Sequence, residues 1–250
     1  MVVGMAKAFR KSGSMLVDLS ADAGLVIVDL LRVLKSKYNY KALSRITGCP
    51  VSTLTRYITG KTSPRGAKAK RLLRNLLRNI NLPVLITEEA DFDGGDLDLT
   101  KIMLNPNMIK IIGAYVLGEF AGMKITSILP LDFLSVPLAS YLATSISRPM
   151  HLISSEPISA DGHSIPLVFS DNDSGSARAY WLFVRKNCKG ESVLMLSSRV
   201  PDPRFFDLLL KTLMGYKMEL GGFFSVAVKE EELRKLKIPP GVKRSYILIT

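Results

Sequence analysis

Hydroxyl and guanidinium side chains stand together on one side of the stretch from Val51 to Ile58, whose pattern predicts a short helix. Leu54, Tyr57 and Ile58 form the apolar side that would lock this helix onto the rest of the protein. The polar side chains that remain outside are Ser52, Thr53, Thr55 and Arg56. Groups of this kind on an exposed helix can hydrogen-bond to base edges in a groove of DNA.

A helix that reads DNA needs a short support helix, joined to it by a tight turn with a small residue. The pattern predicts the support helix from about Tyr40 to Ile46, with Ala42, Leu43 and Ile46 on its buried side. Gly48 supplies the turn. The segment is therefore predicted to be a helix-turn-helix. The alternative is a small helical bundle that binds protein and exposes a solvated basic face.

The run TGCPVSTLTRYITGKTSP resembles the phage-repressor class of helix-turn-helix, with Gly48 at the turn and Gly60, Lys61 and Pro64 after the second helix. The resemblance implies that the second helix contacts bases and that flanking residues contact phosphates, which fixes the register. The base-edge candidates are Val51, Ser52, Thr53, Thr55 and Arg56. The phosphate candidates are Tyr40, Lys41, Lys61, Arg65 and Lys68.

Positive charge is concentrated in the same part of the chain. The whole sequence has a net charge of +12. Residues 1–80 contain 16 lysines and arginines but three acidic residues, whereas residues 81–250 contain 18 basic and 19 acidic residues. A basic block on a near-neutral remainder indicates a dedicated nucleic-acid or anionic-membrane module.

Residues that could bind a metal or form a disulfide are few. Cys49 and Cys188 are far apart and belong to no CxxC motif, and the histidines are His151 and His163. A disulfide framework and a zinc finger are excluded, and we expect neither a metal nor a cofactor. Because no apolar run of about 18 residues lacks a charge, we expect no signal peptide or membrane contact and a cytoplasmic protein.

The elements that must position these residues fall into two predicted domains, residues 1–82 and residues 83–250. Four short helices form the first, and the two not yet described span about Asp22 to Tyr38 and Ala67 to Asn79. Asn81 to Asn107 is expected to be a linker followed by irregular or edge structure. Beyond it, helices alternate with apolar runs, which predicts a parallel sheet covered on both faces. The runs are 125–129, 150–154, 180–184, 193–196 and 223–228.

Met108 to Val228 resembles the type I phosphoribosyltransferase fold, most closely its orotate-type and archaeal purine-regulator branches. The matching passages are KITSILPLDFLSVPLASYLATSISRPMHLISS and SVLMLSSRVPDPRFFDLLLKTLMGYKMELGGFFSVAVKEEE. The resemblance implies a parallel sheet whose strand-to-helix loops carry the ligand at the carboxyl ends of the strands.

The sequence departs from that family where its chemistry is expected. Ser197 and Ser198 stand where the family has two acidic residues that meet the ribose hydroxyls. Pro201 to Arg204 replaces the glycine-rich loop whose amides hold a phosphate, and proline has no amide donor. The loop from Pro130 to Leu134 is bulky where the family has small residues. These departures predict that transferase activity is absent and that the chain is not an enzyme.

Together the two resemblances predict a fold of class α + α/β, with a helix-turn-helix domain before a phosphoribosyltransferase-like domain. The expected function is a sequence-specific transcriptional regulator that binds double-stranded DNA as a homodimer paired by the second domain. That domain is either purely structural or a sensor of an anionic metabolite held between its loops. The candidate ligand residues are Asp132, Ser135, Ser197, Ser198, Arg199 and Arg204.

Two alternatives stay open. One is an active nucleotide-salvage phosphoribosyltransferase with a nucleic-acid-binding appendage, which the two serines and the missing glycines disfavour. The other is a non-specific nucleoprotein component, which would bind DNA without sequence preference.

Overall fold

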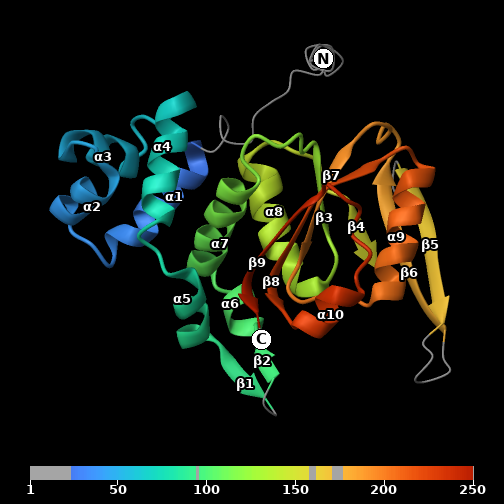
Figure 1. Ribbon diagram of the computed structural model, residues 1–250. Coiled ribbons are helices and arrows are strands. Elements are labelled where there is room, and N and C mark those ends of the chain that lie inside the picture. The colour runs from blue at the N-terminus through green and yellow to red at the C-terminus, as the bar shows by residue number, and fades with distance from the viewer. Residues whose placement is uncertain (1–23, 94–95, 158–161, 171–176, 250) are drawn as a thin grey trace, which may run out of the picture.

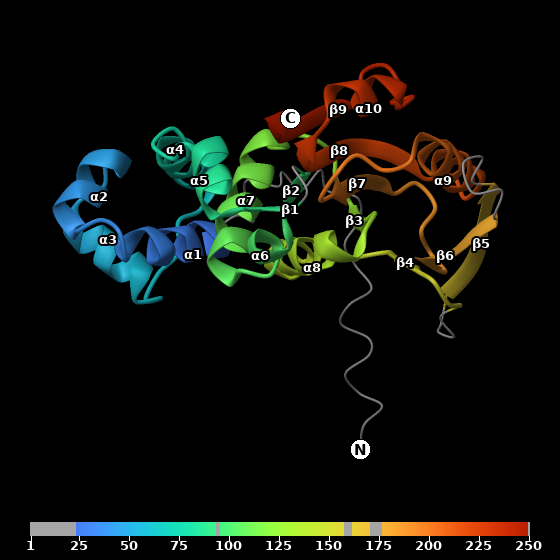
Figure 2. The same cartoon turned by 90° about the horizontal axis from the view of Figure 1, so that it is seen from below.

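The protein is described by a computed structural model that covers residues 24–93, 96–157, 162–170 and 177–249 (Figure 1). A group of helices occupies one end of the molecule, and a sheet with helices packed on it occupies the rest. The helix α7 (Pro106–Glu119) lies between these two parts in both Figure 1 and Figure 2. Within the described ranges, no helix is long and apolar enough to cross a membrane.

The predicted N-terminal helices are present. They are α1 (Gly24–Lys35), α2 (Tyr40–Thr47), α3 (Val51–Ile58) and α4 (Gly66–Leu77). The part of the first predicted helix before Gly24 lies outside the described residues. Each helix turns an apolar side inward, and the side chains with no exposed surface form a common core. They include Ile27, Leu30, Leu31, Leu43, Leu54 and Leu76.

The prediction of a linker after Asn81 is wrong for the first eight residues. These residues form α5 (Leu82–Glu89). Asn81 caps this helix, because its side chain accepts a hydrogen bond from the amide of Val84 at 3.4 Å. Pro83 stands in the first turn, where proline costs the helix no hydrogen bond. The rest of the segment is the short pair β1 (Asp91–Asp93) and β2 (Asp96–Asp98), followed by α6 (Thr100–Met103).

Three of the predicted runs, 125–129, 193–196 and 223–228, lie in the predicted parallel sheet, and a fourth strand near the C-terminus, which was not predicted, extends it. The four strands lie in the order β3-β7-β8-β9 and are parallel throughout. They are β3 (Ser127–Pro130), β7 (Ser192–Ser197), β8 (Glu219–Val228) and β9 (Lys243–Ile249). Along β7, Leu194 and Leu196 pack with α7 and α8 (Val136–Ser145), whereas Val193 and Met195 pack with α9 (Pro203–Gly215). Alternate side chains therefore enter two different cores, which is why β7 is apolar along its length.

The runs 150–154 and 180–184 were expected in the parallel sheet, and both expectations are wrong. Residues 152–154 of the first run form an antiparallel strand of a separate sheet. The same sheet contains the run 180–184. It belongs to β6 (Ala177–Arg185), which pairs antiparallel with β5 (Gly162–Ser170) and β4 (Leu152–Ser154). An apolar run does not by itself encode strand direction, and β6 alternates towards one buried face. Figures 1 and 2 place β5 at the opposite end of the molecule from α2 and α3.

The N-terminal helices do not stand apart from the sheet domain. Helices α1 and α4 both contact α7, and the buried side chains from Val26 to Ile247 form one continuous core. Gly118 permits the approach of α4, since a Cβ atom there would come within 2.6 Å of Leu77 Cδ1. A further tie joins α1 to α8, where the hydroxyl of Tyr141 donates to the carboxylate of Asp29 at 3.3 Å.

A charged network joins the residues just before β4 and β7 to the last residue of β6. Nε2 of His151 lies 2.7 Å from one carboxylate oxygen of Glu191, and the Arg185 guanidinium donates to the other at 2.6 Å. His151 is fully buried. Burial by itself raises the pKa of Glu191, but the hydrogen bonds from His151 and Arg185 outweigh it and hold that pKa below its ordinary range.

This network should make stability depend on pH in acid. Because the folded protein holds the Glu191 carboxylate at a lowered pKa, its contribution is complete above the unfolded pKa and is lost as pH falls through the folded value, below about pH 4. Glu191→Gln should lower the free energy of unfolding at neutral pH by about 1 to 3 kcal/mol. It should also flatten the fall between about pH 5 and pH 3, as measured by urea denaturation.

Glu156→Gln is the matched control, because it removes the same charge from an exposed position. It should leave both the stability and the acid slope as in the unchanged protein. An equal flattening in both variants would show that the slope reflects overall charge and not this network.

Candidate functional site

The turn between α2 and α3 is fixed by local hydrogen bonds. Asn39 begins α2, since its side chain accepts from the Ala42 amide at 2.9 Å. Gly48 ends it with φ +68°, a left-handed conformation that glycine adopts without strain. The Ser44 hydroxyl then donates to the Cys49 carbonyl at 2.7 Å, which closes the turn before α3. The angle between the two helices is therefore set by residues 39–49 themselves.

Helix α3 is locked on one side and open on the other. Leu54 and Tyr57 are buried and Ile58 is half-buried, so the predicted locking side is in place. On α2 Leu43 and Thr47 are buried, while Ala42 and Ile46 are half-buried. The base-edge candidates that the structure exposes together are Val51, Ser52, Thr55 and Arg56, whereas Thr53 is half-buried.

The phosphate candidates differ in their exposure. Lys41, Lys61, Arg65 and Lys68 are exposed. Tyr40 is half-buried, and its ring lies 4.8 Å from the ammonium group of Lys35. Lys68 similarly lies over the ring of Tyr57 at 5.6 Å, which links α4 to α3.

The charge of this region is strongly one-sided. Residues 24–80 contain 13 lysines and arginines, and Asp29 is their one acidic residue. Asp29 contacts Tyr141 of α8 and Arg32, and the Arg32 guanidinium also donates to the Ile58 carbonyl at the end of α3. Apart from Asp29, helices α1 to α4 carry no carboxylate. The open side of α3 is therefore part of a basic surface, which suits a polyanion.

A second candidate site lies at the carboxyl ends of the strands, where Asp132 is the central residue. Its carboxylate accepts hydrogen bonds from the Ser198 amide at 2.7 Å and the Ser197 hydroxyl at 3.1 Å. It also accepts from the Ser135 amide at 2.8 Å, and so caps the short turn η1 (Phe133–Ser135) that leads into α8. Asp132 therefore ties the loop after β3 to the loop after β7.

The candidate ligand residues of this edge divide into two groups. Asp132, Ser135, Ser197 and Ser198 lie together, and the three serines are buried. Arg199 reaches instead to the carbonyl of Leu97 on β2. Arg204 pairs with Asp202 at 3.1 Å, and those bonds keep the Asp202 pKa below its ordinary range although burial raises it.

Sequence reasoning missed one exposed aromatic side chain at this edge. Phe133, next to Asp132, is 85% exposed. The sequence shows that the loop from Pro130 to Leu134 is bulky, but no periodic signal indicates which member of a three-residue turn faces solvent. The ring is available to a planar ligand bound beside the Asp132 carboxylate.

Comparison with known proteins defines the fold of the sheet domain. No family model and no curated protein matches the sequence. Adenine phosphoribosyltransferase of Rhodothermus marinus matches the structure with a TM-score of 0.56 at 11% identity, over 69% of this chain and 100% of that one. The enzyme of Thermoanaerobacter pseudethanolicus gives 0.55 at 11% identity, over 67% and 99%.

A third match is the Trypanosoma brucei adenine phosphoribosyltransferase, solved in complex with AMP, pyrophosphate and ribose-5-phosphate. It has a TM-score of 0.54 at 12% identity, over 69% of this chain and 81% of that one. Residues of this chain thus form a phosphoribosyltransferase-like domain with the parallel sheet of the type I fold.

These matches contradict the prediction that the chain is not an enzyme, because the structures it resembles are enzymes. That prediction relied on Ser197 and Ser198 lacking carboxylates. The fold, however, brings the carboxylate of Asp132 to these two serines. Asp132 is separated from Ser197 by 65 residues along the chain and from Ser198 by 66.

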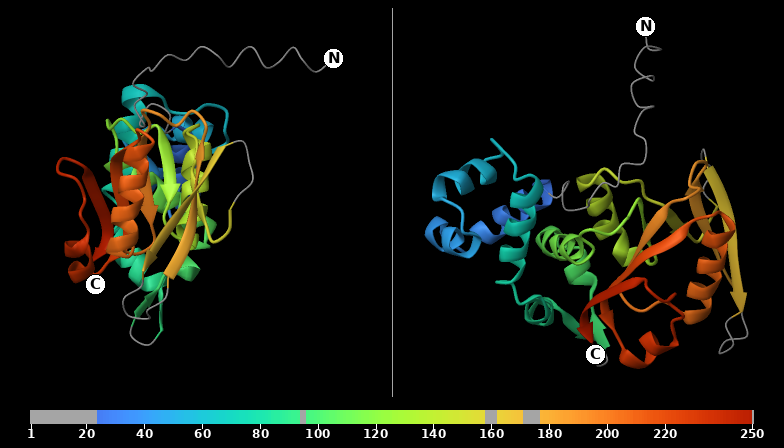
Figure 3. Two further views of the ribbon diagram at one scale, coloured as in Figure 1. Left: turned by 90° about the vertical axis from the view of Figure 1, so that its right-hand side faces the viewer. Right: turned by 45° about the horizontal axis from the view of Figure 1, so that its top comes forward.

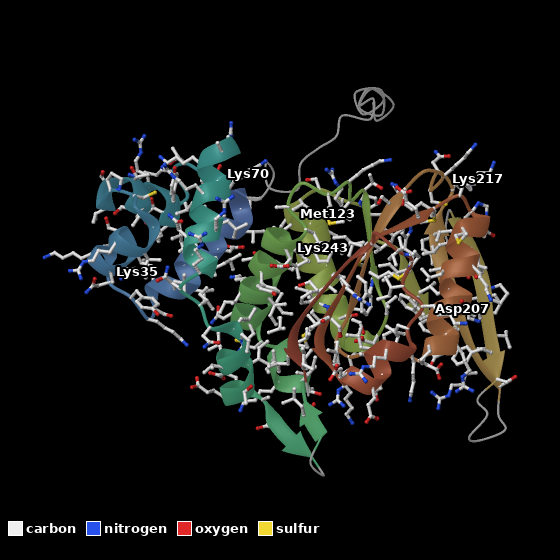
Figure 4. The ribbon with its side chains drawn as sticks, viewed as in Figure 1. Lys35, Lys70, Met123, Asp207, Lys217 and Lys243 are labelled. Atoms are coloured by element: carbon white, nitrogen blue, oxygen red, sulfur yellow. The ribbon has the colours of Figure 1, made fainter. Side chains whose placement is uncertain are left out.

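Removing the carboxylate of Asp132 should loosen both loops. Asp132→Ala leaves the Ser198 and Ser135 amides without their acceptor, so we expect a loss of about 2 kcal/mol in the free energy of unfolding. Asp207→Ala is the control, because it removes the same charge from an exposed pair with Lys211 on α9 (Figure 4). Equal stability of the Asp132 variant and the unchanged protein in urea denaturation would contradict the central role of this residue.

Proposed function

We propose that this chain is a sequence-specific DNA-binding regulator. In this proposal a helix-turn-helix domain, residues 1–82, reads double-stranded DNA, and the phosphoribosyltransferase-like domain, residues 83–250, pairs two copies. The observation that carries it is the open side of α3, with Ser52, Thr55 and Arg56 exposed on a helix locked by Leu54. It lies within a segment of 13 basic residues and one acidic residue.

The side chains of α3 suit the recognition of bases as well as the attraction of the DNA backbone. A guanidinium group can pair with guanine through two hydrogen bonds, and hydroxyl groups can donate to or accept from base edges. The lysines around it suit phosphates, which position a protein without reading sequence. Because one such helix makes few base contacts, we propose that two copies bind half-sites about one helical turn apart.

The sheet edge would then be a sensor site. Ligands of open parallel sheets bind at the carboxyl ends of the strands. At this edge, Phe133 offers an exposed ring. Arg199 is also exposed, although its guanidinium donates to the Leu97 carbonyl as well. We propose an anionic metabolite as the ligand class.

A second candidate function is a nucleotide-salvage phosphoribosyltransferase with a nucleic-acid-binding N-terminal domain. The likeness to adenine phosphoribosyltransferases favours it. In this case the Asp132 carboxylate would be the acidic group nearest to a ribose held over β3 and β7. The two candidates share the DNA-binding surface and differ in what happens at the sheet edge.

The DNA-binding proposal predicts different effects for two cations. Arg56→Ala should cost about 1 to 3 kcal/mol on the preferred site and relax specificity there, because it removes a base contact. Lys61→Ala should weaken all duplexes by similar factors, since phosphates are common to every sequence. Fluorescence anisotropy with a site selected from a random duplex library, and with a scrambled duplex, measures both.

Arg234→Ala on α10 (Glu230–Lys235) is the matched control, because it removes the same charge from an exposed helix outside the basic segment. It should leave both affinities unchanged. Equal losses on the selected and scrambled duplexes for Arg56→Ala would remove α3 from the role of reader.

The second candidate predicts turnover that the first does not require. Incubation with adenine and phosphoribosyl pyrophosphate should yield AMP and pyrophosphate, and Asp132→Asn should lower the rate by at least about tenfold, as expected for a lost charged hydrogen bond to the ribose. Asp207→Asn should leave the rate unchanged. Absence of turnover with every common nucleobase would eliminate this candidate and leave DNA binding untouched.

A further inference from the structure

A groove lies where the N-terminal helices meet the sheet domain, between α4 and the end of α7. The two helices are side by side in Figure 1 and in the right-hand view of Figure 3. The groove has a volume of about 320 Å³, at the lower end of the range of small-molecule sites. It is separate from the open side of α3 and from the sheet edge at Asp132.

The base of the groove is apolar. Leu73 and Leu77 of α4 line it, together with Gly118 and Ala121 from the end of α7 and the residues after it. Gly118 has no side chain to fill the space, and the Leu77 side chain already lies against its backbone. An apolar or planar group could therefore lie on the base of the groove and exclude water from it.

The wall formed by α4 is cationic. Arg74 and Arg78 line it one helical turn apart, and both are exposed. Their positions, four residues apart, place them on the same side of the helix, about 5 to 6 Å from each other at their Cβ atoms. Among the residues that the structure describes, no carboxylate forms an ion pair with either guanidinium. Lys70 stands one turn earlier in the same row (Figure 4).

The one acidic residue in the lining is already neutralised. Glu119 pairs with Lys243 of β9, whose ammonium group lies 3.2 Å from its carboxylate. The same lysine also donates to the Glu119 carbonyl, and Ser245 contacts the carboxylate at 3.4 Å. The field in the groove is therefore set by the arginines of α4.

We propose that this groove binds a nucleoside phosphate, with the phosphates on Arg74 and Arg78 and the base on the apolar floor. Guanidinium groups bind phosphate through paired hydrogen bonds, and two of them one turn apart suit a diphosphate better than a single charge. A DNA backbone would use the cations but would have no need of the apolar floor. The inference does not rest on the proposed DNA binding.

A bound nucleotide would touch both parts of the protein at once. Helix α4 contacts α1 and α2 as well as α7, so a ligand between α4 and α7 joins the helical part to the sheet domain. Ligand binding at such a junction stabilises the packed arrangement over any arrangement in which α4 moves away.

The test is calorimetric titration of the full chain with ADP, with adenosine and inorganic pyrophosphate as separate probes. We expect ADP to bind at micromolar concentration and each half-ligand to bind at least about tenfold more weakly, because each uses only part of the groove. The double variant Arg74→Ala/Arg78→Ala should lose at least about tenfold in ADP affinity. Arg71→Ala is the matched control, since Arg71 is exposed on α4 but does not line the groove.

Ala121→Leu provides a second variant that fills the groove without changing charge, because Ala121 lines the groove at an exposed position, and its fold is checked by circular dichroism. Loss of ADP binding in this variant supports the site. Three results would overturn the proposal: no ADP binding by the unchanged protein at millimolar concentration, full binding by the double arginine variant, or an equal loss in Arg71→Ala. A double variant that loses affinity for duplex DNA while ADP fails to bind the unchanged protein would assign the arginines to the DNA backbone instead.

Discussion

Burial of α7 on two sides is the constraint on which the rest of the structure depends. Eight of its fourteen residues are buried, from Met108 to Leu117. One side packs on sheet residues such as Leu194 and Phe224, while the other receives α1 and α4. A helix that is apolar nearly all round must be covered nearly all round. The N-terminal helices therefore help to cover the sheet domain with their apolar sides. Their basic sides stay exposed to solvent.

At the sheet edge, a likeness of fold is not a likeness of chemistry. The likeness to adenine phosphoribosyltransferases is a likeness of chain path at 11 to 12% identity in the structures compared. The edge itself is built differently from what the sequence passages suggested, because Asp132 bridges two loops and occupies the Ser198 amide. Function at this edge therefore depends on whether the Asp132 carboxylate holds only the loops or also meets a ligand.

The sequence indicated much of the fold because its periodic signals are strong. The apolar stripe of α1, the Gly48 turn and the fully apolar β7 all report local requirements that residue types express directly. The direction of β6 was not readable, since Leu182 and Val184 satisfy either a parallel or an antiparallel neighbour. Helix α5 was hidden because Pro83 and nearby acidic residues resemble a linker until Asn81 is seen as a cap. The contact of Asp132 with Ser197 and Ser198 joins distant residues, which no local pattern encodes.

The placement of charge follows from the same packing. Asp29, the one acid of residues 24–80, is used at the junction, where it accepts from Tyr141 and lies near Arg32. Burial and the nearby Asp29 charge together raise the pKa of the Tyr141 hydroxyl, so it remains a donor at physiological pH. The other cations of these helices have no carboxylate within their own segment to oppose them. Because α4 carries Lys68 towards α3 and Arg74 towards α7, one helix presents positive charge both to the surface proposed for DNA and to the groove proposed for a nucleotide. A change in the packing of α4 on α7 would therefore move charged side chains on both surfaces.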